Sequence, residues 1–194
     1  MYPLFYLGNI AYWKVLCQTE KIVFDIAQPI PKKSYVNRTI ILTANGIQAL
    51  TIPLKGGRGS KSPLSELEIS YAEKWIDKHK MALLSAYSKS PFYEYYMPYF
   101  ERILDSKFEK LVDINYALTK EIHRILKLQS DINLISSDTK LAYHSIPNEF
   151  HSISEYPQVF RYKFPFYPDL SILDLLFNLG PDARTYLTTT EINS

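Results

Sequence analysis

The chain has 194 residues, 46% of them apolar, and its 22 basic residues nearly balance its 20 acidic residues, leaving a formal charge of +2. This length fits a single domain over residues 1–194 with a sizeable core, and the balanced charge gives no argument for a nucleic-acid partner or an anionic membrane surface. The single cysteine, Cys17, excludes an internal disulfide and a multi-cysteine zinc site, and no apolar run approaches the roughly 18 residues of a transmembrane segment.

The first part of the chain predicts a strand, a helix and a second strand. We expect a short strand at Leu4–Leu7, a helix that Asn9 caps and that runs to about Gln18, and a buried strand at Lys21–Ile26. This order is typical of two parallel strands joined by a helix, so the expected fold class is mixed α/β with a Rossmann-like opening. The N-terminal residues lack the basic region of a signal peptide, which favours a cytoplasmic location.

A β-hairpin is predicted next. Asn37–Thr43 and Gln48–Leu54 are rich in Thr, Ile and Leu, and Asn45-Gly46 between them favours positive φ. Arg38 lies at the edge of the first of these strands, where its guanidinium can bind a carboxylate or a phosphate through two parallel hydrogen bonds. A structural ion pair with an acidic residue is the alternative for this arginine.

The glycine-rich run from Lys55 to Lys61 follows the hairpin and predicts a loop. Its backbone N–H groups, together with the cations Lys55, Arg58 and Lys61, can wrap a phosphate or another anion. The spacing of a Walker A motif is absent. A solvated loop without a ligand is the alternative.

The second half of the chain predicts mostly helix. A short strand at Leu67–Ser70 is followed by a helix over Ala72–Tyr87 and by a second helix that begins at Ser90-Pro91 and carries many aromatic residues. A third helix runs from Asp113 to Leu128, and Ile132–Ile135 reads as a strand. The hairpin and this helical half complete the expected mixed α/β fold.

The run Phe166–Pro181 contains a helix with clear start and stop signals. Ser171 is placed as the N-cap, with Asp174 three residues later as in a capping box. The helix is apolar nearly all round, which predicts a buried position, and Gly180 and the proline after it end the helix. The long mixed segment Asp138–Pro168 before it is a candidate lid.

His79 is the candidate acid or base, because histidine titrates near neutral pH. It shares a helical face with Trp75 and Leu83, so a core histidine with satisfied hydrogen bonds is the alternative. The four histidines do not have the spacing of a metal site, and neither a nucleophile elbow nor a dinucleotide fingerprint is present. Nothing in the sequence requires a metal or a cofactor. The 16 tyrosines form either a tyrosine-rich core or stacking surfaces for a sugar or a base.

Four groups of motifs, spread over nearly the whole chain, resemble the WbqC-like family, a bacterial group linked to O-antigen and other surface-polysaccharide gene clusters. They are Pro3-Leu-Phe-Tyr-Leu-Gly-Asn-Ile-Ala-Tyr-Trp13; Lys32-Lys-Ser-Tyr-Val-Asn-Arg38 with Ala44-Asn-Gly46 and Thr51-Ile-Pro53; Trp75 to His79 with Ala86-Tyr87 and Ser90-Pro-Phe-Tyr-Glu-Tyr-Tyr96; and Tyr156-Pro-Gln-Val-Phe160 with Phe166–Pro181. The resemblance implies a role in making or decorating bacterial surface glycans, by transferring an acyl or aminoacyl group to an amino sugar. The opening also looks like nucleotidyltransferase domains, but the turn Tyr6-Leu-Gly-Asn9 lacks both histidines of their HxGH motif.

The first hypothesis is therefore a cytoplasmic transferase that acts on a nucleotide-linked or lipid-linked amino sugar, in a cleft at the carboxyl ends of the parallel strands. Its expected anion contacts are Asn37, Arg38, Lys55 and Arg58, and its expected walls are Tyr6, His79, Tyr87 and Tyr93, with His79 as acid or base. The second hypothesis is a non-catalytic module that binds a glycan precursor or a protein partner. A homodimer through the aromatic residues of Ser90–Phe100 is compatible with either one.

Overall fold

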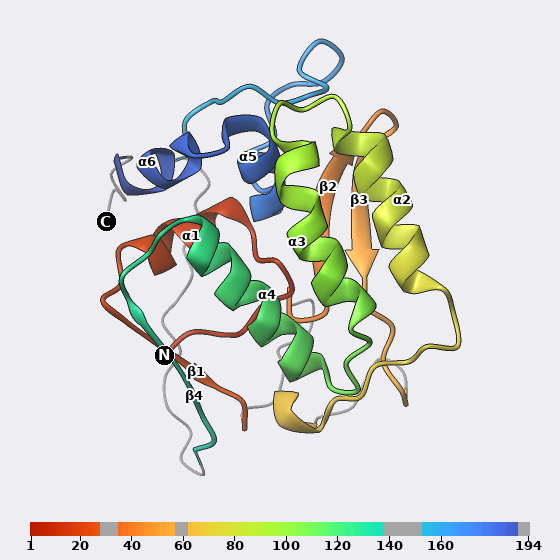
Figure 1. The fold of residues 1–194 in the computed structure, drawn as a ribbon, viewed down its shortest axis with the longest axis vertical. Coiled ribbons are helices and arrows are strands. Elements are labelled where there is room, and N and C mark those ends of the chain that lie inside the picture. The colour runs from red at the N-terminus through yellow and green to blue at the C-terminus, as the bar shows by residue number, and fades with distance from the viewer. Residues whose placement is uncertain (28–34, 57–61, 138–152, 190–194) are drawn as a thin grey trace.

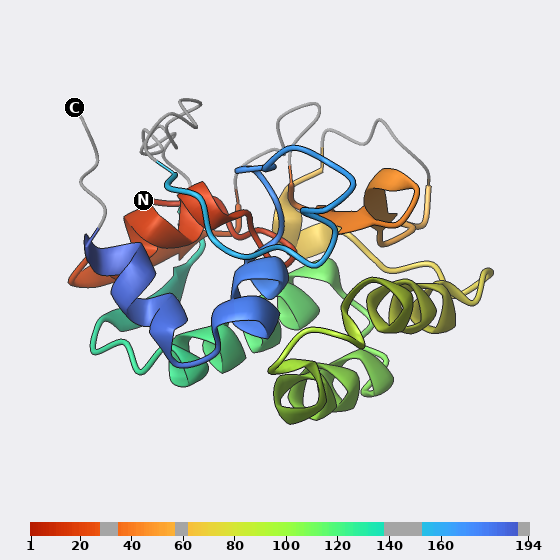
Figure 2. The same cartoon turned by 90° about the horizontal axis from the view of Figure 1, so that it is seen from above.

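The computed structural model describes residues 1–27, 35–56, 62–137 and 153–189 and has a mixed α/β fold with a mostly helical second half, as the sequence predicts (Figure 1). Its elements are α1 (Ile10–Cys17), β1 (Lys21–Asp25), β2 (Arg38–Thr43), β3 (Gly46–Thr51), the 3-10 helix η1 (Leu64–Glu66), α2 (Trp75–Tyr87), α3 (Tyr93–Asp105), α4 (Leu111–Ile125), β4 (Asp131–Ile135), α5 (Ile172–Leu179) and α6 (Asp182–Thr189). Seen from above, α2, α3 and α4 lie on one side, and α1 and the β2–β3 hairpin lie on the other (Figure 2).

β1 forms a parallel pair with β4, in a register that runs from Lys21 opposite Asp131 to Asp25 opposite Ile135. The parallel pairing expected at the N-terminus is reduced to one bridge between Tyr2 and Phe24. The strand predicted at residues 4–7 is absent, because the backbone N–H of Tyr6 donates to the carbonyl of Tyr35 rather than to a strand of this sheet.

The predicted hairpin is confirmed as β2 and β3, which pair antiparallel from Arg38 opposite Thr51 to Thr43 opposite Gly46. Gly46 has a φ of 102°, which the Asn45-Gly46 turn requires. Beyond the last ladder pair, the Ile52 N–H donates to the Asn37 carbonyl. The strand predicted at 67–70 consists only of isolated bridges, from Glu68 to Lys110 and from Ile69 to Leu54.

The predicted helices of the second half form, with shifted starts. Ser90 does not cap α3, because its hydroxyl donates to the carbonyl of Tyr87 at 2.6 Å and so closes the end of α2. Asp113 lies in the first turn of α4 rather than at its cap. In the described residues, no helix combines the length and the apolar content needed to cross a membrane.

α5 is the buried helix that its sequence predicts. The Ser171 hydroxyl accepts a hydrogen bond from the Leu173 N–H at 3.3 Å, and Gly180 ends the helix with a φ of 55°. Asp174 does not complete a capping box, because its carboxyl group turns into the core. The further helix α6 begins directly after Pro181, a position where proline is tolerated because the first turn of a helix needs no bonded N–H.

Candidate functional site

Four polar residues from three distant segments meet beside the first residue of β2. They are Asn9, Tyr35, Arg38 and Asp169, and we call them the Arg38 cluster. The Tyr35 hydroxyl donates to Asp169 Oδ2 at 2.7 Å, and the Asn9 side-chain amide donates to Asp169 Oδ1. The Arg38 guanidinium lies 5.8 Å from the centre of the Tyr35 ring. A cation, an aromatic ring and a carboxylate therefore stand together.

The backbone places this cluster where two helices begin. Asn9 caps α1 by accepting a hydrogen bond from the Tyr12 N–H at 2.9 Å. Asn9 also forms an antiparallel bridge with Ser171, the N-cap of α5, so the amino ends of α1 and α5 lie side by side. Because the amino end of a helix carries partial positive charge, this junction favours an anion, and the Asp169 carboxylate stands next to it.

The backbone turn before α1 is held in an uncommon conformation. Leu7 has a φ of 60° and Gly8 a φ of 42°. A side chain at Gly8 would start 2.5 Å from the ring of Tyr12, so only glycine fits there. The turn lets Tyr6 point into the core while Asn9 reaches Asp169.

Burial and hydrogen bonding act in opposite directions on the Asp169 carboxyl group. Burial raises its pKa, whereas the hydrogen bonds from Tyr35 and Asn9 lower it. Burial is also the main cause of the raised pKa of Tyr35, and the nearby Arg38 charge opposes that shift. At neutral pH the Tyr35 hydroxyl is therefore a donor rather than a phenolate.

Tyr6 and His79 form a buried pair next to the Arg38 cluster. The Tyr6 hydroxyl lies 3.0 Å from His79 Nδ1, and the Trp75 ring contacts His79 edge-on at 5.1 Å. Burial lowers the pKa of His79 to about 4, although a hydrogen bond with the backbone of Thr51 opposes the shift. Thr51 lies opposite Arg38 in the hairpin. Tyr6 and His79 therefore pack against the start of β2 from the core side.

The pair is closed off from solvent, with exposed fractions of 0% for Tyr6 and 3% for His79. This environment is that of a core histidine, the alternative that the sequence left open. The role of His79 as acid or base stays a prediction.

The other predicted anion contacts lie in different places. The Asn37 side-chain amide donates to the Ile52 carbonyl at 2.9 Å, so it links the two strands at the open end of the hairpin. The Lys55 ammonium pairs with Glu68 at 2.7 Å, on the surface. Arg58 lies outside the described residues. Of the predicted cations that the structure describes, Arg38 is the one beside Tyr35.

The predicted walls Tyr87 and Tyr93 pack around Phe177 of α5 rather than around Tyr6, each with its ring centre 5.2 Å from that of Phe177. Tyr87 is fully buried, and burial, followed by the Asp174 charge, raises its pKa. The predicted site residues thus divide between the start of β2 and the core around α5.

Sequence reasoning missed Tyr35 and Asp169 as site residues and saw Asn9 only as a helix cap. Tyr35 lay within a motif of the family resemblance, and Asp169 stands two residues before the N-cap Ser171. These two positions in the sequence were the signals by which Tyr35 and Asp169 could have been chosen as site residues. The hydrogen bond that joins Tyr35 to Asp169 spans 134 positions, a pairing that no local pattern encodes.

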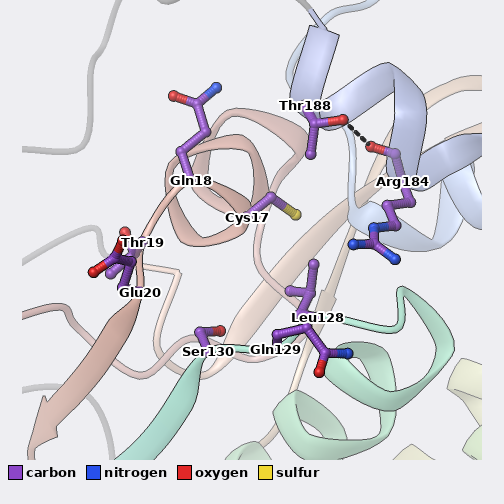
Figure 3. Close-up of a pocket in the computed structure, with 9 residues that line it drawn as sticks. All are labelled: Cys17, Gln18, Thr19, Glu20, Leu128, Gln129, Ser130, Arg184 and Thr188. Carbon is purple, nitrogen blue, oxygen red and sulfur yellow. Dashed lines mark hydrogen bonds between the residues drawn. The ribbon is translucent and has the colours of Figure 1, made fainter.

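A pocket of about 280 Å³ lies away from these residues, where α1 ends and where β1 and β4 begin (Figure 3). The transferase hypothesis expects its cleft at the carboxyl ends of the parallel strands, whereas this pocket lies at the amino ends of β1 and β4. The pocket is lined by Cys17, Gln18, Thr19, Glu20, Leu128, Gln129, Ser130, Arg184 and Thr188. In the part of the chain that the structure describes, no three His, Cys, Asp or Glu side chains gather as metal ligands.

Comparison with protein families gives one result that covers most of the chain. A model of the WbqC-like protein family matches residues 5–146 and 135–186. Searches of curated proteins and of solved structures gave no significant match.

Proposed function

The chain belongs to the WbqC-like protein family, and from this we propose that it is a cytoplasmic transferase of bacterial surface-glycan biosynthesis. In this proposal its substrate is a nucleotide-linked or lipid-linked amino sugar, which receives an acyl or aminoacyl group. The name of the family is associated with O-antigen biosynthesis, and the chemistry of the Arg38 cluster suits such a substrate.

The observation that carries the proposal is the meeting of Arg38, Tyr35 and Asp169 at one half-buried place. A guanidinium binds phosphate or carboxylate through two parallel hydrogen bonds, and a sugar-phosphate offers that group. A carboxylate such as Asp169 accepts hydrogen bonds from hydroxyl and amino groups, which an amino sugar carries. An aromatic ring such as Tyr35 stacks on the apolar face of a sugar.

Each nearby residue has a part in this proposal. Arg38 binds the anion, and Asp169 orients the sugar. Tyr6 and His79 are positioning residues, because they support the segment before Asn9 and the start of β2 from the core side. With its pKa near 4, His79 is neutral at pH 7, so one of its ring nitrogens carries a hydrogen and the other is free to accept a hydrogen bond.

A non-catalytic module that binds a glycan precursor is the second candidate. The burial of both Tyr6 and His79 favours it, since the predicted acid or base does not face solvent beside Arg38. Binding without turnover would then be the function. The two candidates share the binding site and differ only in whether product forms.

A thermal-shift panel of nucleotides, nucleotide-sugars, acyl-CoA and amino acids tests binding. Ligand at about 100 times its Kd stabilises the native state by about 2.7 kcal/mol, which for a chain of this size raises Tm by roughly 5–10 °C. We expect one nucleotide-sugar to give such a shift, and Arg38→Ala to remove the shift while leaving the Tm of the free protein within about 2 °C.

Arg102→Ala is the matched control, because Arg102 is an exposed helical arginine on α3. It should keep the ligand-induced shift. An equal shift in Arg38→Ala and wild type would remove the Arg38 cluster from the proposal, and loss of folding in Arg38→Ala would make Arg38 structural. Mass spectrometry of the binding ligand incubated with acyl-CoA or an aminoacyl donor then separates a transferase from a binding module.

A further inference from the structure

The pocket of Figure 3 is built by one face of α6 and by the ends of α1, β1 and β4. The Asp131 N–H donates to the Glu20 carbonyl at 3.1 Å, which places the residues before β1 and β4 next to each other. α1 ends at Cys17 on one side, and α6 supplies Arg184 and Thr188 on the other. The pocket shares no residue with the Arg38 cluster.

Most polar groups of the lining already have partners within the protein. The Ser130 hydroxyl bonds with His123 Nε2 at 3.0 Å, and the Thr19 hydroxyl bonds with the Val15 carbonyl at 2.9 Å. The Thr188 hydroxyl bonds with the backbone carbonyl of Arg184 at 3.1 Å. The Thr19 and Thr188 hydroxyls already donate their proton to a backbone carbonyl, so they cannot also donate it to an anionic ligand.

The Arg184 guanidinium is different. It points toward Cys17 and Leu128, into the space between them (Figure 3). The ion pairs found among the described residues do not include Arg184. A guanidinium carries five N–H donors and a permanent positive charge, so it favours binding of an anion such as a carboxylate or a phosphate. The acidic side chain of the lining, Glu20, stands well apart from Arg184 in the same view.

Cys17 and Leu128 give the pocket an apolar floor beside this charge. Burial raises the pKa of the Cys17 thiol to about 12, and the nearby Arg184 charge opposes the shift. The thiol is therefore neutral at pH 7 and acts as a contact surface rather than as a nucleophile. A ligand that suits both features has one anionic group and a small apolar part.

We propose that this pocket binds a small organic anion, a carboxylate or a phosphate monoester, through the Arg184 guanidinium. The uncharged part of the ligand lies against Leu128 and Cys17. The volume of about 280 Å³ is close to the lower limit of small-molecule sites, which favours a compact ligand. This inference does not depend on the function proposed for the Arg38 cluster.

Cys17 supplies a direct reporter of occupancy, because it is the single cysteine of the chain. The rate of its alkylation by iodoacetamide is measured at about pH 9, where more of the thiol is ionised. The additions are lactate, ethyl phosphate and the neutral amide lactamide. Lactate and ethyl phosphate separate the two anion classes, and lactamide controls for effects of shape without charge.

We expect at least one of the two anions to slow alkylation about tenfold at about ten times its Kd, since occupancy follows the factor 1 + [L]/Kd. Lactamide should not protect. Arg184→Ala should lose the protection, and Arg102→Ala should keep it. Each variant is compared with itself with and without the anion, because removing Arg184 also changes the reactivity of the free thiol.

Two results would overturn the proposal: equal protection in Arg184→Ala and wild type, or no protection by either anion. If Cys17 reacts too slowly to follow, ligand-observed NMR with the same compounds and variants decides in its place. There, no binding of either anion to wild type contradicts the proposal. The Arg38 variants are not used, so failure here leaves the proposed function standing.

Discussion

The Asp174 carboxyl group is enclosed in the core by the side chains of Tyr156, Tyr87 and Asn178. The Tyr156 hydroxyl donates to Asp174 Oδ1 at 2.6 Å, and Asn178 Nδ2 lies 3.4 Å from the same oxygen. Burial nevertheless raises the pKa of Asp174 to about 6, because these donors do not replace the water that the carboxylate has lost. A buried acid on a mostly apolar helix therefore weakens the fold when it ionises.

This predicts a stability that depends on pH. Because the pKa is higher in the folded state than in the unfolded state, folding binds a proton, and the stabilisation is fully present below pH 3.8. It is lost as pH rises through about 6. The shift corresponds to about 3 kcal/mol. We expect Asp174→Asn to remove this dependence and to be more stable than wild type at pH 7, since the Asn oxygen still accepts from Tyr156.

Urea unfolding of both proteins between pH 4 and 8 measures the effect. His79 acts in the opposite direction, because its lowered pKa gives stability that is lost as pH falls from 6.5 toward 4. The difference between wild type and Asp174→Asn cancels that contribution. Asp105→Asn, at an exposed ion pair with Lys80, is the control and should follow wild type. A difference that does not change with pH would show that the pKa of Asp174 is the same in the folded and unfolded states.

At the scale of single residues, the sequence indicates which residues are candidates for the site better than it indicates which residues they contact. Arg38 and the Tyr6–His79 pair were chosen from the sequence and lie near one another. Asp174 was expected to cap α5, since its position three residues after Ser171 fits that role equally well. Only the packing of Tyr156 from a distant segment reveals why the carboxyl group points inward.

The end of α5 depends on Gly180. Its φ of 55° and ψ of −125° form a combination that other residues rarely adopt. A Cβ atom there would start 2.6 Å from the ring of Phe92, directly before α3. The helix end and the start of α3 therefore fit together only with glycine at this position.

Gly180→Ala should lower the free energy of unfolding by about 2–4 kcal/mol, from backbone strain and the displaced ring together. Gly46→Ala is the matched control, since Gly46 also has positive φ but a Cβ atom at that position would meet nothing within 4 Å. It should cost only about 1–2 kcal/mol. Urea unfolding of both variants checks the order, and equal costs would mean that Phe92 moves aside freely.

Elements with local signals at both ends were predicted well. The Asn45-Gly46 turn marks the hairpin, and Ser171 with Gly180 marks α5. The strand expected at Leu4–Leu7 failed because an apolar run also suits a buried irregular segment, here one bonded to Tyr35. Helix α6 was missed because Pro181 reads as a stop, although a proline equally precedes a helix.

At the scale of the whole molecule, the Arg38 cluster depends on contacts between the two ends of the chain. Segment 5–9, the start of β2 and the residues before α5 meet there, and the Ser171 N–H donates to the Ile40 carbonyl at 2.7 Å. Such a junction requires three segments that lie far apart in the sequence. Local sequence patterns could suggest its members, as with Arg38, but not their meeting.

Most aromatic residues of α3 are buried, so few of them are available for a dimer interface. Tyr93, Tyr96 and Phe100, from the run proposed as a dimer interface, are buried in the core. Of that run Tyr95 remains 65% exposed, and the ring of Tyr99 is partly covered by the Arg124 guanidinium at 4.9 Å from its centre. A stable interface needs roughly 800 Å² from each partner, more than these two rings supply.

We therefore expect the protein to sediment as a monomer at micromolar concentration, with Tyr95→Ser indistinguishable from wild type. Tyr162→Ser is the control, because Tyr162 is 82% exposed and lies outside α3. A wild-type dimer that Tyr95→Ser dissociates and Tyr162→Ser leaves intact would contradict this expectation and restore the homodimer hypothesis. The core needs the buried rings of α3, so in that case the interface must include surface beyond Tyr95 and Tyr99.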